Sequence, residues 1–524
     1  MLLVILSLLA HSPTVPMNCA TPVFDQFKTG SMPARPESKK PANPPQLGEK
    51  RLFWLQNMSV MPPQQYQAEM TCRGIGPYCY VMIDDSVWNE GLVDSADVAR
   101  IVEKFNFSSP RDSTRGVWQH STEVLGFPPD AIDSDSAIYL LYYNVGTFRG
   151  IAFDGFWQFF DQYYDTTSMR RWSYHSNEVE CVYIDCYPNN PSSDYRVAIA
   201  AHEFGHMIHW NYDEYEDIWV QEGFCELAMW LYGAPDPISS FPSNPDNDLT
   251  SWTGVWADYI KTYLWSLFLY EQYGGRIGND LIHNIIASTA TGIPGIDQGF
   301  ETTGLPERFE QVFDQWVIAN RVNDTTFEGG KYGYYGERVP NFAVSGYHTS
   351  YPVSRNADLN RYAGEYVLFQ RGSGLELGFD GDDAGDFRLY LYAKDTVQGR
   401  AYLDTIALDA NQQGSASVPG FDTAYQSVYL IPVNHNPAGK TAYAYQASVL
   451  GGIAEQGLPP VARPAGKPTV MRAAMLNALE PNARLFSADG QALRQKHGRP
   501  IPAGVFFVVS DQTPDKARRV VVVP

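Results

Sequence analysis

The alternation of apolar and polar residues changes near residue 345, and this change constrains the fold more than any other feature of the sequence. From about Arg51 to Val344, strand-like stretches such as CYVMIDD and AIYLLYYN are mixed with helix-like stretches such as ADYIKTYLWSLFLYEQYGG. After about Ser345, apolar and polar residues alternate at strand spacing, with Gly, Asp and Asn between the runs. We therefore predict an α+β domain over residues 51–344, followed by a β-sandwich over 345–455.

The end of the chain predicts a second, smaller β-sandwich. The Pro-rich stretch GLPPVARPAGKP indicates a linker over residues 456–468. Residues 469–524 then contain ARLFSADGQALRQ, which has the pattern of two strands joined by an Asp489-Gly490 turn, and two further strand-like runs. A chain of 524 residues is too long for one hydrophobic core, so several domains are expected.

The start of the chain favours export. MLLVILSLLA is too short to span a bilayer and is typical of a signal peptide, which we place over residues 1–20, with Cys19 in or near it. No basic residue precedes this stretch, and a buried strand is the alternative. Residues 21–50 are rich in Pro and Lys, which indicates a linker or pro-segment rather than a packed element. We expect a secreted or cell-surface protein with no transmembrane segment.

The cysteines suggest two disulfides. Cys72 and Cys79 flank turn residues, and Cys181 and Cys186 bracket VYID, so two short-loop bridges fit an exported protein. Free buried thiols are the alternative for each pair. Cys225 stands alone in an apolar helical pattern and is expected to be a core residue. The formal charge of −21 excludes nucleic acid and anionic membranes as expected partners, because both require basic patches.

A metal-binding motif lies within AIAAHEFGHMIHW. His202 and His206 are one helical turn apart on one face, so both imidazoles can reach the same ion, and Glu203 lies beside them as the general base of an H-E-x-x-H site. His209 falls one turn beyond His206. We interpret His209 as a packing or supporting histidine rather than a ligand.

A second helical stretch, WVQEGFCELAMWLYG, supplies two carboxylates on one face. Glu222 and Glu226 are costly to bury on so apolar a helix unless they are paired or bound to metal. We assign Glu222 as the third ligand, with Glu226 accepting a hydrogen bond from the other ring nitrogen of His202. The reverse assignment is the weaker alternative. Two imidazoles and one carboxylate favour a single zinc ion.

The two motifs together, AAHEFGHMIHW and WVQEGFCELA, resemble those of the gluzincin metallopeptidases, although Gln221 replaces the usual Asn. SNEVECVYID and NYDEYEDIWVQEG resemble the hyicolysin-like secreted peptidases more narrowly. The resemblance implies a zincin-like α+β catalytic domain and a zinc metallopeptidase that acts on protein or peptide substrates. The chain lacks the G-x-M-E-N stretch that anchors a free amine in aminopeptidases of this group, which favours an endopeptidase.

The same resemblance suggests an oxyanion-stabilising residue. DYIKTYLWSLFLYEQYGG is similar to a gluzincin helix whose first tyrosine stabilises the oxyanion, and that position is Tyr259, with Tyr263 as the alternative. On its residues alone, Tyr259 is better interpreted as a core tyrosine, and the resemblance makes the catalytic role an equal alternative. The stretch from Val179 to Ile184 is either a sheet edge that pairs with substrate or an ordinary core strand.

Three further expectations concern the β domains. Residues 469–524 resemble the sorting domains of type IX secretion cargo, which implies secretion machinery as a partner. The acidic run from Asp380 to Asp386 is a calcium site or a solvated turn. The competing class of function is a non-catalytic secreted binding protein, with a degenerate peptidase domain and a ligand held by the β-sandwich. A zinc hydrolase acting on a non-peptide bond is the third alternative.

Overall fold

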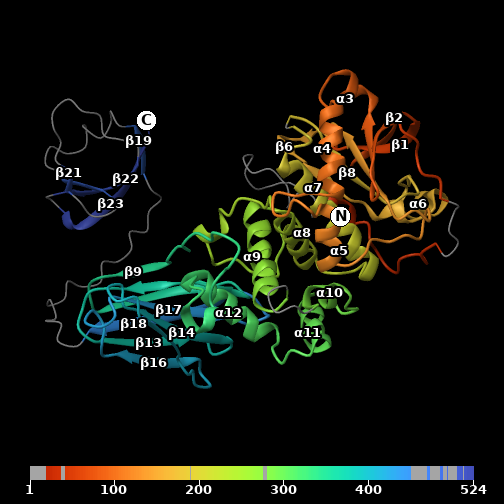
Figure 1. The fold of residues 1–524 in the computed structure, drawn as a ribbon. Coiled ribbons are helices and arrows are strands. Elements are labelled where there is room, and N and C mark those ends of the chain that lie inside the picture. The colour runs from red at the N-terminus through yellow and green to blue at the C-terminus, as the bar shows by residue number, and fades with distance from the viewer. Residues whose placement is uncertain are drawn as a thin grey trace. The chain divides into compact units, whose positions relative to one another are not determined.

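The computed structural model describes residues 19–36, 42–188, 190–274 and 280–449, together with five strands beyond residue 468. The chain divides into two compact units, residues 1–452 and 453–524. The first unit is of mixed α/β type, with a helical part and several β-sheets, which agrees with the expected α+β and β-sandwich-like order (Figure 1).

A six-stranded sheet forms the centre of the α+β part, in the order β1-β2-β3-β4-β8-β7. Strands β3, β4 and β8 run parallel and are buried along their whole length, as expected for strands covered on both faces. The strand bounds are β1 Lys50–Asn57, β2 Gln64–Ile75, β3 Cys79–Asp84, β4 Ile138–Tyr143, β7 Gly155–Phe156 and β8 Cys181–Asp185.

The last strand, β7, pairs antiparallel with β8 and forms the edge of the sheet. Strand β8 lies between β4 and β7, so the hypothesis that residues 179–184 form an open substrate-binding edge is wrong. The short hairpin β5 (Thr147–Phe148) and β6 (Ile151–Ala152) leads into β7.

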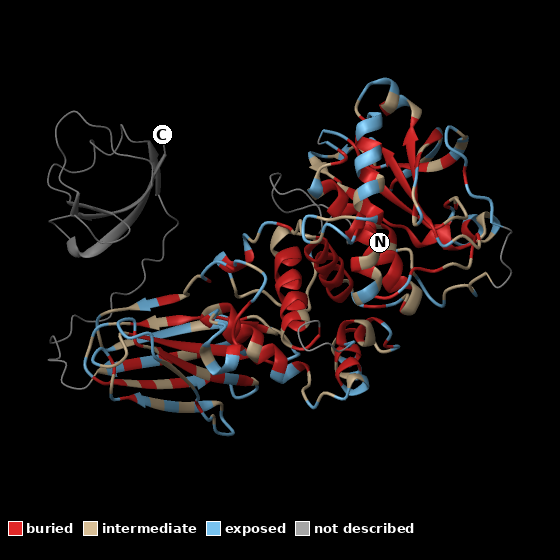
Figure 2. Ribbon diagram, viewed as in Figure 1, coloured by how far each residue is buried: buried red, intermediate tan, exposed pale blue. Residues whose placement is uncertain are grey.

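Helices surround this sheet, and three of them form the centre of the unit. Helix α7 packs on α8, and α8 packs on α9. Figure 2 shows α9 buried along most of its length, whereas α4 exposes one face. The helix bounds are α3 Asp85–Asn89, α4 Ser95–Asn106, α5 Val117–Val124, α6 Asp165–Trp172, α7 Asp194–Tyr212, α8 Ile218–Tyr232, α9 Trp256–Gln272, α10 Leu281–Ile286, α11 Gly292–Thr303 and α12 Phe309–Val322.

Local sequence explains where α7 and α8 start, stop and touch. The Ser193 side chain accepts a hydrogen bond from the Arg196 N–H and caps the start of α7. Helix α8 ends at Gly233, whose φ of 106° is a left-handed conformation that glycine adopts readily. A Cβ at Gly205 would lie 3.1 Å from Cys225 Sγ, so glycine lets α7 and α8 approach closely.

Two sheets pack face to face after residue 345. One has the order β10-β18-β13-β16 and the other β15-β14-β17-β12-β9, with β11 also pairing with β17. A separate apolar cluster, including Leu377, Leu391 and Leu430, fills the space between them. The bounds are β9 Gly346–His348, β10 Val353–Leu359, β11 Ala363–Gly364, β12 Val367–Phe369, β13 Leu375–Gly381, β14 Phe387–Lys394, β15 Ala401–Thr405, β16 Gln413–Val418, β17 Ser427–Asn434 and β18 Thr441–Val449.

The second unit contains a five-stranded sheet in the order β19-β23-β22-β20-β21. Strands β20 and β21 pair antiparallel, as the expected hairpin requires. The expected Asp489-Gly490 turn between them lies outside the described residues. The bounds are β19 Thr469–Arg472, β20 Arg484–Ser487, β21 Ala492–Leu493, β22 Gly504–Ser510 and β23 Thr513–Val523.

The predicted disulfides are wrong, because all six cysteines are free and buried. Cys181 opens β8 and Cys186 follows its end, so extended backbone holds them about 16 Å apart, too far for a bridge. Cys72 faces Met82 in the β2–β3 register, whereas Cys79 lies further along the same pair of strands. Cys225 is a core residue, as expected.

The N-terminal expectations are met only in part. Residues 1–18 of the proposed signal peptide lie outside the described residues. Its predicted end at residue 20 is wrong for this fold, because residues 19 and 20 pack into the domain and pair with Gly155. Cys19 and Ala20 are buried in the α+β part, and the short helix α2 (Thr21–Asp25) places Phe24 fully inside it. The expectation that residues 21–50 are unpacked is therefore wrong for its first part, since Phe24 supplies an apolar anchor. None of the helices among the described residues is long and apolar enough to cross a membrane.

Candidate metal centre

Helices α7 and α8 bring the three expected ligand side chains together. His202 Nε2 lies 3.3 Å from Glu222 Oε2, and His206 Nε2 lies 3.5 Å from Glu222 Oε1. All three side chains are at most 2% exposed. His202 Nε2 and both Glu222 oxygens have no hydrogen-bond partner among the described residues. Buried polar atoms without partners are costly, which indicates that this cluster is built for an additional group.

Cys19 joins the same cluster. Its Sγ lies 3.4 Å from His206 Nε2, and one ligand atom from each of Cys19, His202, His206 and Glu222 lies within 4.8 Å of the others. Donor atoms arranged tetrahedrally around zinc are about 3.3–3.8 Å apart, given bonds of about 2.0–2.3 Å. The measured separations of 3.3, 3.4 and 3.5 Å therefore fit a zinc-sized ion.

Glu226 lies behind the cluster. Its Oε1 is 3.3 Å from His202 Nδ1, on the opposite side of the ring from Glu222. The placement behind the ligand histidine is the expected one, but the two atoms lie at ion-pair distance without the geometry of a hydrogen bond, so the predicted hydrogen bond itself is not formed. Among the described residues, the ionic partners within 4.0 Å of Glu222 and Glu226 are histidines only. Two buried carboxylates without a lysine or arginine partner favour a bound cation.

Glu203 faces the cluster from the α7 side nearest the sheet edge. It is fully buried, and burial raises the pKa of its carboxyl to about 7, while the His202 charge acts in the opposite direction. A carboxylate with a pKa near neutrality suits a proton carrier. Gly155 of β7 allows this approach, because a Cβ there would lie 3.2 Å from Glu203 Cγ and 2.9 Å from Ile199 Cγ2.

The histidines differ in protonation. Against the effect of burial, Cys19, Glu222 and Glu226 hold the pKa of His202 well above its usual range, so a cation that binds there has to displace a proton from this ring. Burial holds the pKa of His206 well below its usual range, so its ring is neutral and its nitrogens can act as ligands. His209 is likewise neutral, since burial lowers its pKa to about 3. His209 belongs to no ligand cluster among the described residues and packs near Phe224, with ring centroids 6.1 Å apart, as expected for a packing residue.

The two tyrosines of α9 lie in different surroundings. The Tyr259 hydroxyl lies 3.4 Å from the backbone oxygen of Cys19 and donates toward it, so Tyr259 borders the cluster. The Tyr263 hydroxyl donates to Glu337 Oε2 at 3.0 Å instead. The structure thus favours Tyr259 over Tyr263 as the residue near the reacting groups.

Sequence reasoning missed Cys19. It assigned this residue to the signal peptide, and its partner His206 lies 187 positions away. The available signal was a cysteine beside a packed aromatic stretch, CATPVFDQF, in which Phe24 and Phe27 resemble core residues rather than a linker. Residue spacing within a helix identifies ligands on that helix. It gives no information about contacts between residues 187 positions apart.

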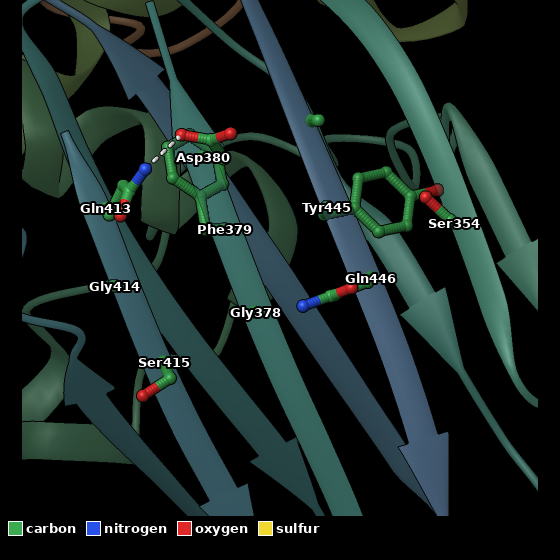
Figure 3. Close-up of a pocket in the computed structure, with 10 residues that line it drawn as sticks. Ser354, Gly378, Phe379, Asp380, Gln413, Gly414, Ser415, Tyr445 and Gln446 are labelled. Atoms are coloured by element: carbon green, nitrogen blue, oxygen red, sulfur yellow. Dashed lines mark hydrogen bonds between the residues drawn. The ribbon is translucent and has the colours of Figure 1, made fainter. Parts of the chain in front are cut away.

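The β-sandwich has a hollow on its four-stranded sheet, away from the ligand residues. The hollow has a volume of about 510 Å³. Figure 3 shows the side chains of Asp380, Gln413, Tyr445 and Gln446 around it. Gly378 and Gly414 contribute no side chain, which leaves the surface concave. The concave shape is compatible with the alternative hypothesis of a ligand-binding sandwich, and in the described part of the chain shape is the one feature that supports it.

The acidic run forms the β13–β14 turn. Asp382 accepts a hydrogen bond from the Ala384 N–H, and Asp380 accepts one from Gln413 Nε2. Within the described part of the chain, the cluster containing Cys19 is the only group of at least three potential metal ligands. These contacts are those of a solvated turn, and calcium binding by the run stays an untested hypothesis.

Comparisons with known proteins do not assign a family. No protein-family model matches the sequence, and no curated protein matches it. The chain is similar to the pre-peptidase C-terminal domain of a collagenase from Bacillus anthracis over 21% of its own length and 100% of that domain, at 11% identity and a TM-score of 0.17. It is similar to the Yersinia pseudotuberculosis-derived mitogen over 20% of its length and 93% of that chain, at 12% identity and a TM-score of 0.15. A Bacillus licheniformis lipase in its propeptide form matches over 75% of this chain and 93% of the lipase, at 12% identity and a TM-score of 0.15.

Proposed function

We propose that the chain is a secreted zinc metallopeptidase of the gluzincin type, acting as an endopeptidase. The observation that carries the proposal is the buried convergence of His202, His206 and Glu222, with Glu203 facing the same point. Their donor types and separations suit zinc. A zinc ion there would supply Lewis acidity toward a water molecule and a peptide carbonyl.

The protein's own side chains supply the proton transfers. Glu203 accepts the proton of the attacking water at a carboxylate oxygen and returns it to the nitrogen of the leaving amine. Its pKa near 7 suits both steps at neutral pH. The Tyr259 hydroxyl donates a hydrogen bond to the carbonyl oxygen as negative charge develops there, which is worth roughly 3 kcal/mol for one good donor. Glu226 fixes the orientation of the His202 ring.

Strand β7 is the proposed docking edge for substrate. It is the terminal strand of the sheet, and Gly155 brings its backbone next to Glu203. An extended peptide that pairs with this edge by backbone hydrogen bonds would place a carbonyl beside the base. Such backbone pairing favours internal peptide bonds, because it needs residues on both sides of the cleaved bond.

The test combines metal analysis with hydrolysis of casein. Glu203→Gln is expected to keep zinc and lose turnover, whereas Glu222→Ala is expected to lose zinc. Because Cys19 lies within the ligand cluster, activity is compared in a Cys19→Ala background, where it should disappear with a chelator and return with zinc. Zinc content unchanged in Glu222→Ala, or full activity in Glu203→Gln, would rule out these roles and favour the non-catalytic binding protein.

A further inference from the structure

The N-terminal strap, which we define as residues 19–36, lies across the metal centre. Cys19 forms a parallel bridge with Gly155, and the Ala20 N–H donates to the Gly155 carbonyl at 3.0 Å. The Trp157 N–H donates to Thr21 Oγ1 at 2.8 Å. The strap thus occupies the same edge of β7 that a substrate would need.

Each group that the proposed reaction uses is engaged by the strap. The Cys19 sulfur lies 3.4 Å from His206 Nε2, within the ligand cluster. The Thr21 hydroxyl donates to Glu203 Oε2 at 3.0 Å, which occupies the base. The Tyr259 hydroxyl is directed at the Cys19 carbonyl, which occupies the oxyanion donor. All of these side chains are buried, so substrate has no access while the strap is docked.

We propose that the strap is an autoinhibitory segment, in which the Cys19 thiolate takes the fourth ligand position and displacement of the strap opens the enzyme. This inference rests on the proposed function, because it concerns regulation of the same site. A thiolate is a strong zinc ligand, and a cation compensates for burying it beside Glu203 and Glu222. A structural zinc site with four permanent protein ligands is the competing interpretation.

Contacts away from the metal hold the strap in place. The Phe24 ring lies 5.0 Å from Phe156 and 6.2 Å from Phe160, measured between centroids. The Phe27 ring lies 5.1 Å from Tyr174. Further along, the Arg171 side chain donates to the backbone oxygens of residues 29 and 31, and Arg35 donates to the Trp210 oxygen at 2.8 Å and stacks on its ring.

These anchors distinguish an inhibitory strap from a permanent ligand. They are made by one continuous segment, and none of them links helices α7, α8 and α9 to one another. The three ligands His202, His206 and Glu222 come from the helices alone. The strap can therefore leave as a unit without removing any of the other ligands, and a permanent structural site would not need to cover the base and the oxyanion donor.

The experiment uses the full chain loaded with Co(II), which reports thiolate ligation through a sulfur-to-metal charge-transfer band. The intact mass of the purified protein first shows whether Cys19 is retained, and a mature protein without Cys19 overturns the proposal. The wild type is expected to show the band and little casein hydrolysis. Cys19→Ala is expected to keep one Co(II), lose the band and hydrolyse casein at least about tenfold faster with zinc. Cys186→Ala is the matched control, since it removes a buried cysteine outside the cluster and should leave band and activity unchanged.

The outcomes separate failure of the strap from failure of the peptidase. Co(II) bound without a charge-transfer band in the wild type overturns thiolate ligation. Loss of metal from Cys19→Ala overturns the strap and indicates a structural site. If Cys19→Ala binds Co(II), lacks the band and hydrolyses casein no faster, Phe24→Ala is added to remove the main apolar anchor of the strap. If this double variant also hydrolyses nothing, the ligation stands and the peptidase proposal fails. If Cys19→Ala does not fold, the alkylation rate of Cys19 in the wild type is measured with and without a chelator. Removing the metal should accelerate alkylation, and an unchanged rate overturns the proposal.

Discussion

Replacing Phe24 with alanine should release the N-terminal strap. Phe24 is fully buried, and its ring contacts belong to Phe156 and Phe160 on the body of the domain. Truncating a buried phenylalanine to alanine costs about 3–5 kcal/mol. Because Phe24 belongs to the strap and its partners belong to the body of the domain, this loss weakens docking of the strap. The undocked fraction should rise by about 10²- to 10⁴-fold.

The assay is the rate at which iodoacetamide alkylates Cys19 in the zinc-loaded protein, measured by mass spectrometry of the peptide carrying it. When opening is fast, that rate follows the undocked population, so Phe24→Ala should raise it by about 10²-fold or more. Phe127→Ala is the matched control, because Phe127 is 62% exposed and lies outside the strap. An alkylation rate unchanged in a Phe24→Ala protein that still melts cooperatively would refute the reasoning.

Three further predictions concern the site and its surroundings. In the Cys19→Ala background, Tyr259→Phe should lower kcat by about 10²-fold with little change in KM, and an unaltered kcat would remove Tyr259 from the mechanism. Glu226→Gln should weaken zinc binding by about 10- to 100-fold in a chelator competition, whereas equal affinity would show that Glu226 does not support His202. Burial raises the pKa of Glu216 to about 8 from the 4.5 of an exposed carboxyl, so its stabilising contribution is complete below pH 4.5 and is lost as pH rises through 8. Glu216→Gln should therefore melt at a higher temperature than the wild type at pH 9 and at nearly the same temperature at pH 5. The difference in unfolding free energy at pH 9 is at most about 5 kcal/mol. Equal melting temperatures of the two proteins at both pH values would contradict the raised pKa.

Short-range patterns carried most of what the sequence could predict about the site. His202 and His206 share a face because they are one turn apart, and the same holds for Glu222 and Glu226. Glu222 and Glu226 lie on an apolar helix, so burying their carboxylates is costly unless they face polar or charged groups. The structure brings these groups to 3.3–3.5 Å from one another, although the metal itself stays a prediction.

Long-range placement is where sequence reasoning failed. The edge strand β7 has only two residues, too few to show the alternation of apolar and polar residues by which strands are predicted. The spacing of Cys181 and Cys186 suggested a loop, but three of the four intervening residues are β-branched or aromatic, and the segment extends as a buried strand. Cys19 was assigned by its nearness to an apolar start, whereas Phe24 fixes its place in the fold.

The burial of the cluster is the property that connects these findings. His202, His206 and Glu222 are inaccessible, which suits a tightly held cation but prevents any substrate from reaching it. A hydrolase built on these residues must therefore have a second, open arrangement. The strap is the element that can provide one, since it supplies Cys19 and Thr21 from a single segment. Its fully buried residues in the main apolar core are Ala20 and Phe24, whereas α7 and α8 are buried along most of their length. The same contacts that complete the ligand set thus define which part of the chain has to move.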